Sequence, residues 1–547
     1  MAQDHTLSTP GETYLLGIDV GTGSARAGLF DTAGTMLASD KRDITLWQES
    51  GGVAEQSSDE IWSSVCGAVR GAVEKAGVDP SRIVAMGFDA TCSLVVLGEG
   101  GKPLPVGTGG DPRRNIIVWM DHRATDQAER INATGHSVLD YVGGIISPEM
   151  ETPKLLWLKE NLAETYHGAW QFFDLADFLG WKATGDLARS SCTVTCKWTY
   201  LAHEDRWDPD YFRLIGLGDL PDEDFASVGQ RIVPSGTPLG QGLSAEAAAD
   251  LGLRPGIPVG AGLIDAHAGG IGTVGAKKEP ERTLAYVFGT SSCTMTSTQE
   301  PVFIPGVWGP YYQAMVPGMW LNEGGQSAAG AAVDQLVSFH PAAAEARQSA
   351  NNEGYSLPGW LAERARQSVD TPSDAVTLAR GLHVVPEFLG NRAPFADPQS
   401  RAVIAGLGME RGVDSLVALY VAGICGLGYG LRQIIETQAE NGAPVDTIAI
   451  SGGAGSHPLV RQLLADTTGL PVLAPRAQEP VLLGSAMLGA VAAGCFTDIP
   501  TAMAAMSSAD AVYNPATGQV AALHEERYRS YRQLQDVARS IRRAAEH

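Results

Sequence analysis

Residues 14–37, YLLGIDVGTGSARAGLFDTAGTML, decide the fold of this chain. An apolar strand runs into a Gly-Thr-Gly-Ser turn, a second strand of small residues follows, and an Asp-Thr-Ala-Gly turn leads to a third strand. The segment predicts a β-meander opened by a glycine-rich hairpin. The same strand, hairpin and strand plan returns at TLAYVFGTSSCTMTS, residues 283–297, which indicates an internal duplication.

The chain of 547 residues is long enough for two or three domains, each with its own core. Strands and helices alternate along it, and apolar residues recur at helical spacing over 58–76, 416–441 and 483–493. The polar link KKEPER at 277–282 places a boundary near residue 278. We therefore predict an N-terminal domain at 13–277, a C-terminal domain at 283–495 and a helical tail without chemistry at 496–547.

Composition excludes several classes of protein. With 44% hydrophobic and 18% charged residues the chain is that of a folded, enzyme-sized protein, and a net charge of −23 repels nucleic acid. The first residues lack the basic and apolar regions of a signal peptide, and no apolar run of about 18 residues is expected to span a membrane. We expect a cytoplasmic protein that binds neither nucleic acid nor membrane.

The seven cysteines are odd in number and scattered, so a disulfide framework is not expected and a reducing compartment is. Cys192 and Cys196 are the only close pair. A zinc site would need two further ligands at suitable spacing, and none lies near them in the sequence.

The first hairpin carries groups suited to a phosphate and a cation. Asp19 ends the strand, and Gly21-Thr22-Gly23-Ser24 offers backbone N–H groups and hydroxyls to an anion. The motif is neither a Walker A loop nor GxGxxG, and an ordinary hairpin remains the alternative. The second hairpin, Gly289-Thr290-Ser291-Ser292, has no acidic residue, so the pair together predicts a clamp around one polyphosphate.

A third glycine-rich element lies at IAISGGAGSHPLVRQLL, residues 448–464. A strand that ends in Ser451-Gly452-Gly453 and leads into a helix lets a nucleoside lie against glycine backbone, where a side chain would block the ring. Glycines alone are weak evidence for such a site.

These elements, in this order, resemble the FGGY carbohydrate kinases of the actin-like ATPase superfamily over roughly residues 13–495. Six blocks are similar to those of the pentulose kinases: GFDATCS (87–93), WMDHRA (119–124), SSCTVTCKWTYL (190–201), GLIDAHAG (262–269), NEGGQSAAGAA (322–332) and GNRAPFADPQSRAVIAGL (390–407). The resemblance implies an α/β protein of two ribonuclease-H-like domains with a central cleft.

The resemblance also implies roles for individual residues. Asp265 matches the catalytic base, which is to accept the proton of a hydroxyl attacking the γ-phosphoryl group, although it could also cap the following helix. Asp19 would serve Mg²⁺. The residues assigned to the sugar are Asp89, Cys92, Ser93, Asp121, Lys197, Asp265 and Glu323. Those assigned to ATP are Gly21, Thr22, Gly23, Ser24, Arg26, Gly289, Thr290, Ser291, Gln326, Gly452, Gly453, Ala454 and His457.

Two of these assignments have stated alternatives. Asp121 could merely pair with Arg123 or His122, and a lone lysine such as Lys197 is usually a solvated surface charge. His457 stands where many relatives have Asn, which leaves hydrogen bonding to the adenine open.

The implied activity is the ATP-dependent phosphorylation of a ketopentose, with D-ribulose as the expected substrate and the 5-phosphate as product. Ribitol, L-ribulose, xylulose and glycerol kinases are the competitors within the enzyme class. The alternative from another class is a non-catalytic actin-like sensor that binds nucleotide. Sugar and ATP are the expected partners, and a homodimer stays open.

Overall fold

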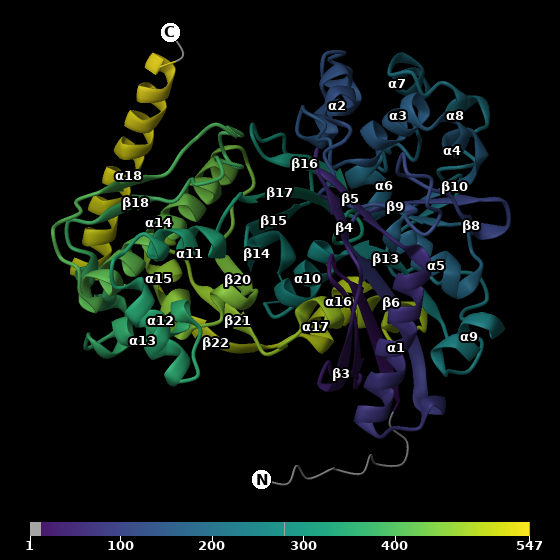
Figure 1. Cartoon of the computed structure of the whole chain (residues 1–547). Helices are drawn as coiled ribbons and strands as arrows, with labels where there is room; N and C mark the ends of the chain where they lie inside the picture. Colours follow the sequence, from purple (N-terminus) through teal and green to yellow (C-terminus); the bar gives the residue numbers. More distant parts are fainter. Residues whose placement is uncertain (1–12, 278, 546–547) are drawn as a thin grey trace.

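The computed structural model describes residues 13–277 and 279–545 of the chain. It contains two large sheets, each flanked by helices, in two lobes that Figure 1 shows side by side. Residue 278, near which the predicted domain boundary falls, lies outside the described residues, as do the first twelve residues.

The first sheet combines an antiparallel meander with parallel strands. Strand β1 pairs antiparallel with β2, which pairs with β3, while β6 and β13 run parallel on the other side of β1. The predicted meander is thus confirmed. The spatial order is β13-β6-β1-β2-β3, with bounds Val259–Ile264, Ile83–Ala90, Tyr14–Val20, Ser24–Phe30 and Met36–Asp43. Every residue of β1 is buried, because helices cover both faces of the sheet.

The second sheet repeats this plan. Strand β14 pairs antiparallel with β15 and parallel with β20, and β15 pairs with β17. The order is β16-β17-β15-β14-β20-β21-β22, with bounds Trp308–Tyr312, Trp320–Gln326, Ser292–Thr298, Thr283–Phe288, Thr447–Ser451, Val472–Pro475 and Ala509–Tyr513. Strands β14, β15, β17 and β20 hold the places of β1, β2, β3 and β6, so the predicted internal duplication is confirmed.

Smaller elements extend the first domain. An antiparallel sheet in the order β10-β7-β9-β5-β4 is built from Ala169–Asp174, Leu94–Gly98, Ile116–Ile117, Val53–Gln56 and Trp47–Glu49. Helix α1 (Ser58–Ala76) has the predicted bounds and packs on β2 and β3. Its start is capped by the Ser57 hydroxyl, which accepts a hydrogen bond from the Glu60 amide.

Helix α16 (Pro480–Ala492) lies on the first sheet, although its sequence falls in the range predicted for the C-terminal domain. Figure 1 shows this yellow-green helix beside the purple strands of the N-terminus. The contact is a backbone contact, because a Cβ built on Gly17 would lie 1.9 Å from the Leu482 carbonyl oxygen. On the helix itself, a Cβ on Gly484 would lie 2.0 Å from the carbonyl oxygen of Ala268 in helix α10 (Asp265–Val274).

Helix α14 (Val413–Glu440) is the long apolar helix of the second domain. Among the described residues it alone is long and apolar enough to span a membrane by length and composition, and 78% of its tested window is buried inside the protein. We expected no membrane-spanning segment, and the mostly buried core helix of a folded domain passes the same test of length and composition. The helix is apolar all round because α15 (Pro458–Thr468) and other elements of its own domain surround it.

The prediction of a purely helical tail at 496–547 is wrong, because the tail also contains a strand. Strand β22 pairs antiparallel with β21 at the edge of the second sheet, from Tyr513 opposite Val472 to Ala509 opposite Pro475. Helix α18 (Gly518–Ala545) follows and packs on α14 and α15 through Tyr528 and Tyr531. The period-2 pattern of β22 is weak because it is an edge strand with mostly exposed side chains.

Substituting Gly484→Ala is expected to destabilise the protein, because the new methyl group would meet the Ala268 carbonyl and overpacking costs about 1–3 kcal/mol. Helix propensity alone predicts the opposite, a gain of about 1 kcal/mol. Thermal unfolding measures the sign. The control is Gly109→Ala, where an added Cβ would meet no atom within 4 Å. A Gly484→Ala protein as stable as the wild type would contradict the close packing of α16.

Candidate functional site

Three carboxylates gather at the ends of neighbouring parallel strands. Asp19 near the end of β1 lies in register with Asp89 of β6, and Asp265 follows β13 directly as the first residue of α10. Parallel strands end at the same edge of a sheet, which is where ligands bind in open α/β sheets. The backbone thus brings together three acidic residues that are far apart in the sequence.

Two of these acids, Asp89 and Asp265, have raised pKa values. Burial first, and then the charge of Asp19, raise the pKa of Asp89 well above its usual range, while a hydrogen bond donated by the Ser485 hydroxyl opposes the shift. Burial and the Asp19 charge likewise raise the pKa of Asp265 to about 6. Its Oδ1 accepts a hydrogen bond from the adjacent Ala266 amide at 2.7 Å, and Ile264 holds the N-cap position, so Asp265 is not the N-cap of α10.

Arg26 of β2 connects this cluster to α16. Its Nε lies 2.7 Å from Asp19 Oδ2, and its Nη1 lies 2.8 Å from Glu479 Oε2 just before the helix. Arg26, Glu479 and the first hairpin line a cavity of about 570 Å³, whose other walls include Lys41, Lys75 and Asp40. The cavity combines backbone N–H groups with cationic side chains, which is the chemistry that binds phosphate.

The second hairpin connects β14 to β15. The Gly289 amide donates to the Ser291 carbonyl at 3.0 Å, and the Thr290 carbonyl accepts from the Ala329 amide just before helix α11 (Gly330–Ser338). Gln326 lies near it, but its side chain bonds within the domain, accepting from Tyr286 and Ser292 and donating to the Leu427 carbonyl. Contact of the Gln326 side chain with ATP therefore stays a prediction.

The glycine-rich turn after β20 lines a second cavity. Gly452 has φ +94°, and a Cβ there would lie 2.4 Å from the Phe288 carbonyl oxygen, so only glycine fits. Gly453, Ala454 and His457 line a cavity of about 470 Å³. His457 caps helix α15, since its Nδ1 accepts from the Leu459 amide at 3.1 Å, while its Nε2 lies 3.6 Å from Glu363.

Lys197 and Glu323 come from different domains and act on each other electrostatically. Lys197 ends helix α6 (Ser191–Lys197), and its ammonium lies 5.9 Å from the centre of the Trp308 ring. Glu323 lies on β17. Burial would raise the pKa of this carboxyl, but His267 and Lys197 lower it to about 2. Lys197 therefore interacts with a carboxylate of the other domain and is not the solvated surface charge of the alternative interpretation.

The remaining residues assigned to the sugar differ in whether their polar atoms already have hydrogen-bond partners within the protein. Burial raises the pKa of the Cys92 thiol to about 12. Ser93 Oγ lies 3.2 Å from Thr91 Oγ1 and accepts from the Trp119 amide. Both oxygens of Asp121 accept from Arg123, and Oδ2 accepts from the Ala54 amide as well. The pairing of Asp121 with Arg123 is thus present, and a direct sugar contact stays a prediction.

Three residues of the site escaped the sequence analysis. Ser485 and Glu479 lie hundreds of residues from the acids and arginine they contact, and no local pattern links them. The third, His267, lies in the quoted block GLIDAHAG and contacts Glu323 across the domains. Its position two residues after Asp265 is the sequence feature that could have identified His267 as a site residue.

Family models match both halves of the chain. The N-terminal domain of the FGGY family of carbohydrate kinases matches residues 14–272, and the C-terminal domain of that family matches residues 284–493. The chain therefore belongs to the FGGY family of carbohydrate kinases. It has the two-domain actin-like ATPase fold and acts as a sugar kinase with ATP as the co-substrate, so the non-catalytic sensor is set aside.

Individual relatives span nearly the whole chain. A human FGGY carbohydrate kinase domain-containing protein is 46% identical over 515 residues, covering 92% of this chain and 93% of its own. A D-ribulokinase of Saccharomyces cerevisiae is 39% identical over 522 residues, covering 89% and 73%. The solved xylulose kinase of Lactobacillus acidophilus shares the fold with a TM-score of 0.77 at 20% identity, covering 96% and 98%.

Replacing Asp265 by Asn is expected to stabilise the folded protein at neutral pH. The raised pKa means that the folded state disfavours the ionised carboxyl, so its penalty is present above about pH 6 and vanishes as the pH falls below the unfolded value. Thermal unfolding of both proteins across pH measures this. The control with the opposite sign is Asp446→Asn, because Lys277 lowers the pKa of Asp446 to about 2 and that substitution should destabilise. A destabilised Asp265→Asn protein at neutral pH would contradict the crowding of the three acids.

Proposed function

We propose that this chain phosphorylates a ketopentose with ATP, and that D-ribulose, converted to D-ribulose 5-phosphate, is its preferred substrate. The similarity to the yeast protein named D-ribulokinase supports this choice, as do several bacterial relatives named ribulokinase at 27–32% identity. Ribitol, L-ribulose, xylulose and glycerol are the competing substrates.

The observation that carries the proposal is the meeting of Lys197 and Glu323 beside Asp265. Against the effect of burial, the Lys197 charge helps His267 to lower the pKa of Glu323, and it also acts to lower the pKa of Asp265. An ammonium group donates hydrogen bonds and a carboxylate accepts them. This pair suits a carbonyl and its neighbouring hydroxyl groups, whereas a polyol offers hydroxyl groups only.

Asp265 would act as general base. With a pKa of about 6 the carboxylate is mostly ionised at neutral pH and still basic enough to take the proton of a terminal hydroxyl. As that proton moves to Asp265, the hydroxyl oxygen forms a bond to the γ-phosphorus, and the bond from phosphorus to the bridging oxygen of ADP breaks. The cationic walls of the first cavity would hold the phosphates.

The residues present also suit Mg²⁺ bound together with ATP. In residues 13–277 and 279–545 no group of three or more His, Cys, Asp or Glu is arranged to hold an ion. Magnesium is usually held by one or two carboxylates, phosphate oxygens and water, so a full protein cage is not required. Asp19 would hold the ion, which supplies neutralisation of phosphate charge.

Asp265→Asn should lower kcat about 10²–10⁴-fold, the usual contribution of a positioned general base. Sugar and ATP should still bind, because Asn keeps the shape of the side chain. Steady-state kinetics gives the first quantity and titration calorimetry the second. Turnover within a few-fold of wild type would remove Asp265 from the role of base.

A panel of pentuloses, pentitols, glycerol and aldopentoses tests the substrate. D-Ribulose should have the highest kcat/KM, and Lys197→Met should narrow the gap between ketose and polyol, since a site that leaves a buried polar group unpaired can reject an analogue by about 10⁴–10⁵. More efficient turnover of ribitol or glycerol than of every pentulose would overturn the pentulose assignment and leave the kinase assignment intact.

A further inference from the structure

A buried histidine touches an acidic group on each domain. His267 is 1% exposed and lies on α10, two residues after Asp265. Its Nδ1 is 3.1 Å from the Sγ atom of Cys192 on α6. Its Nε2 is 3.5 Å from Oε2 of Glu323 on β17 of the second domain. Both ring nitrogens are therefore engaged, one in each direction.

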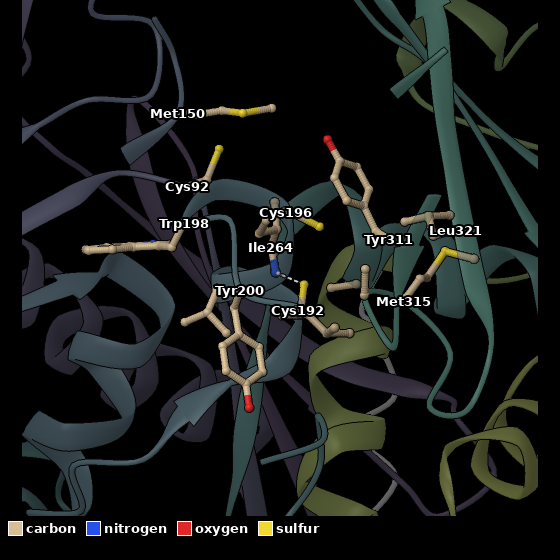
Figure 2. Close-up of a cluster of buried hydrophobic side chains, with 14 of the residues drawn as sticks. Cys92, Met150, Cys192, Cys196, Trp198, Tyr200, Ile264, Tyr311, Met315 and Leu321 are labelled. Carbon is tan, nitrogen blue, oxygen red and sulfur yellow. Dashed lines mark hydrogen bonds between the residues drawn. The ribbon is translucent and has the colours of Figure 1, made fainter. Parts of the chain in front are cut away.

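The surroundings favour an imidazolium ring. Burial alone would lower the pKa of His267, but Cys192 and Glu323 outweigh it and raise that pKa. Burial would raise the pKa of the Cys192 thiol, but the Cys196 thiol and His267 lower it. The Ile264 amide also donates to Cys192 Sγ at 3.4 Å, the contact drawn in Figure 2. The lowered pKa of Cys192 favours a thiolate that accepts a hydrogen bond from Nδ1–H of His267, while Nε2 faces the Glu323 carboxylate at 3.5 Å.

Glu323 is held from a second side as well. The Cys293 thiol donates to its Oε1 at 3.2 Å, so each carboxylate oxygen has one partner. Figure 2 shows Tyr311 and Leu321 of the second domain facing Cys192 and Cys196 of the first. The histidine thus makes a polar contact between the two domains, beside the apolar cluster that both domains share.

We propose that His267 is a positioning residue that bridges Cys192 of the first domain to Glu323 of the second and so orients the Glu323 carboxylate toward the sugar. The bridge also makes sugar affinity depend on the approach of the two domains, because its two ends belong to different sheets. The sugar role of Glu323 rests on the proposed function.

The test is a double-mutant cycle with the sugar that the panel shows to be turned over best. His267→Gln is expected to raise the KM for sugar roughly 10- to 100-fold, the size of a hydrogen bond to a charged group, with kcat and the KM for ATP changed only a few-fold. In a Glu323→Gln background the same substitution should change the sugar KM little, because the group it orients is gone. Additive effects, or an unchanged sugar KM in folded His267→Gln, would overturn the proposal.

A second measurement needs no sugar. A thiolate absorbs in the near ultraviolet where a thiol does not, so the wild type minus Cys192→Ser difference spectrum should show one thiolate that His267→Gln removes. Cys495→Ser, at an exposed cysteine, is the matched control and should leave both the spectrum and the sugar KM unchanged. No thiolate signal from Cys192 would overturn the bridge, whereas a best substrate other than a pentulose would overturn only the substrate assignment.

Discussion

The contact of helix α16 with the first sheet is the constraint on which the rest of the structure depends. The approach is closer than side chains allow, and glycines on the strands make it possible. A Cβ on Gly87 would lie 2.1 Å from the Ser485 carbonyl oxygen, and one on Gly260 would lie 2.5 Å from that of Leu488. Backbone-to-backbone packing of this kind fixes the register of the helix on the sheet, because a shift by one residue would bring a Cβ into each gap.

Two features of the site follow from that register. Ser485 reaches the buried Asp89, and Glu479 at the start of the helix reaches Arg26. Since the chain enters α16 from the second sheet, the helix also joins the second domain to the strands that carry the acidic cluster. The packing of one helix thus determines both the electrostatics of the acids and the connection between the lobes.

Local patterns predicted the parts of the fold that neighbouring residues determine. The two hairpins and α1 depend on strand periodicity, turn glycines and a capping serine, all of which are visible within 25 residues. Local patterns could not predict which sheet α16 packs on, because its apolar residues could pack on either large sheet. The glycines that allow the close approach to the first sheet lie on distant segments of the chain. Strand β22 was missed because an exposed edge strand lacks the alternation that marks a half-buried one.

For the site, sequence blocks identified the neighbourhood better than the contacting atoms. His457 and Gln326 were assigned to ATP from their blocks, yet the first caps a helix and the second bonds inside its domain. Both carboxylate oxygens of Asp121 likewise accept hydrogen bonds within the protein, from Arg123 and from the Ala54 amide. A motif indicates which residue type occupies a position. That residue can stabilise the fold of a loop or helix rather than contact a ligand.

The acidic cluster is unfavourable for the empty protein, and this explains why it requires so rigid a frame. Burial, and then the charge of Asp19, disfavour the ionised forms of Asp89 and Asp265 and so raise the pKa of each. Loosely held strands would separate until water screened the acids. The parallel register of β1 and β6, held from below by the glycine contacts of α16, prevents that separation. The crowding keeps a carboxylate basic near neutral pH, and the stability it costs is offset by packing far from the reacting atoms.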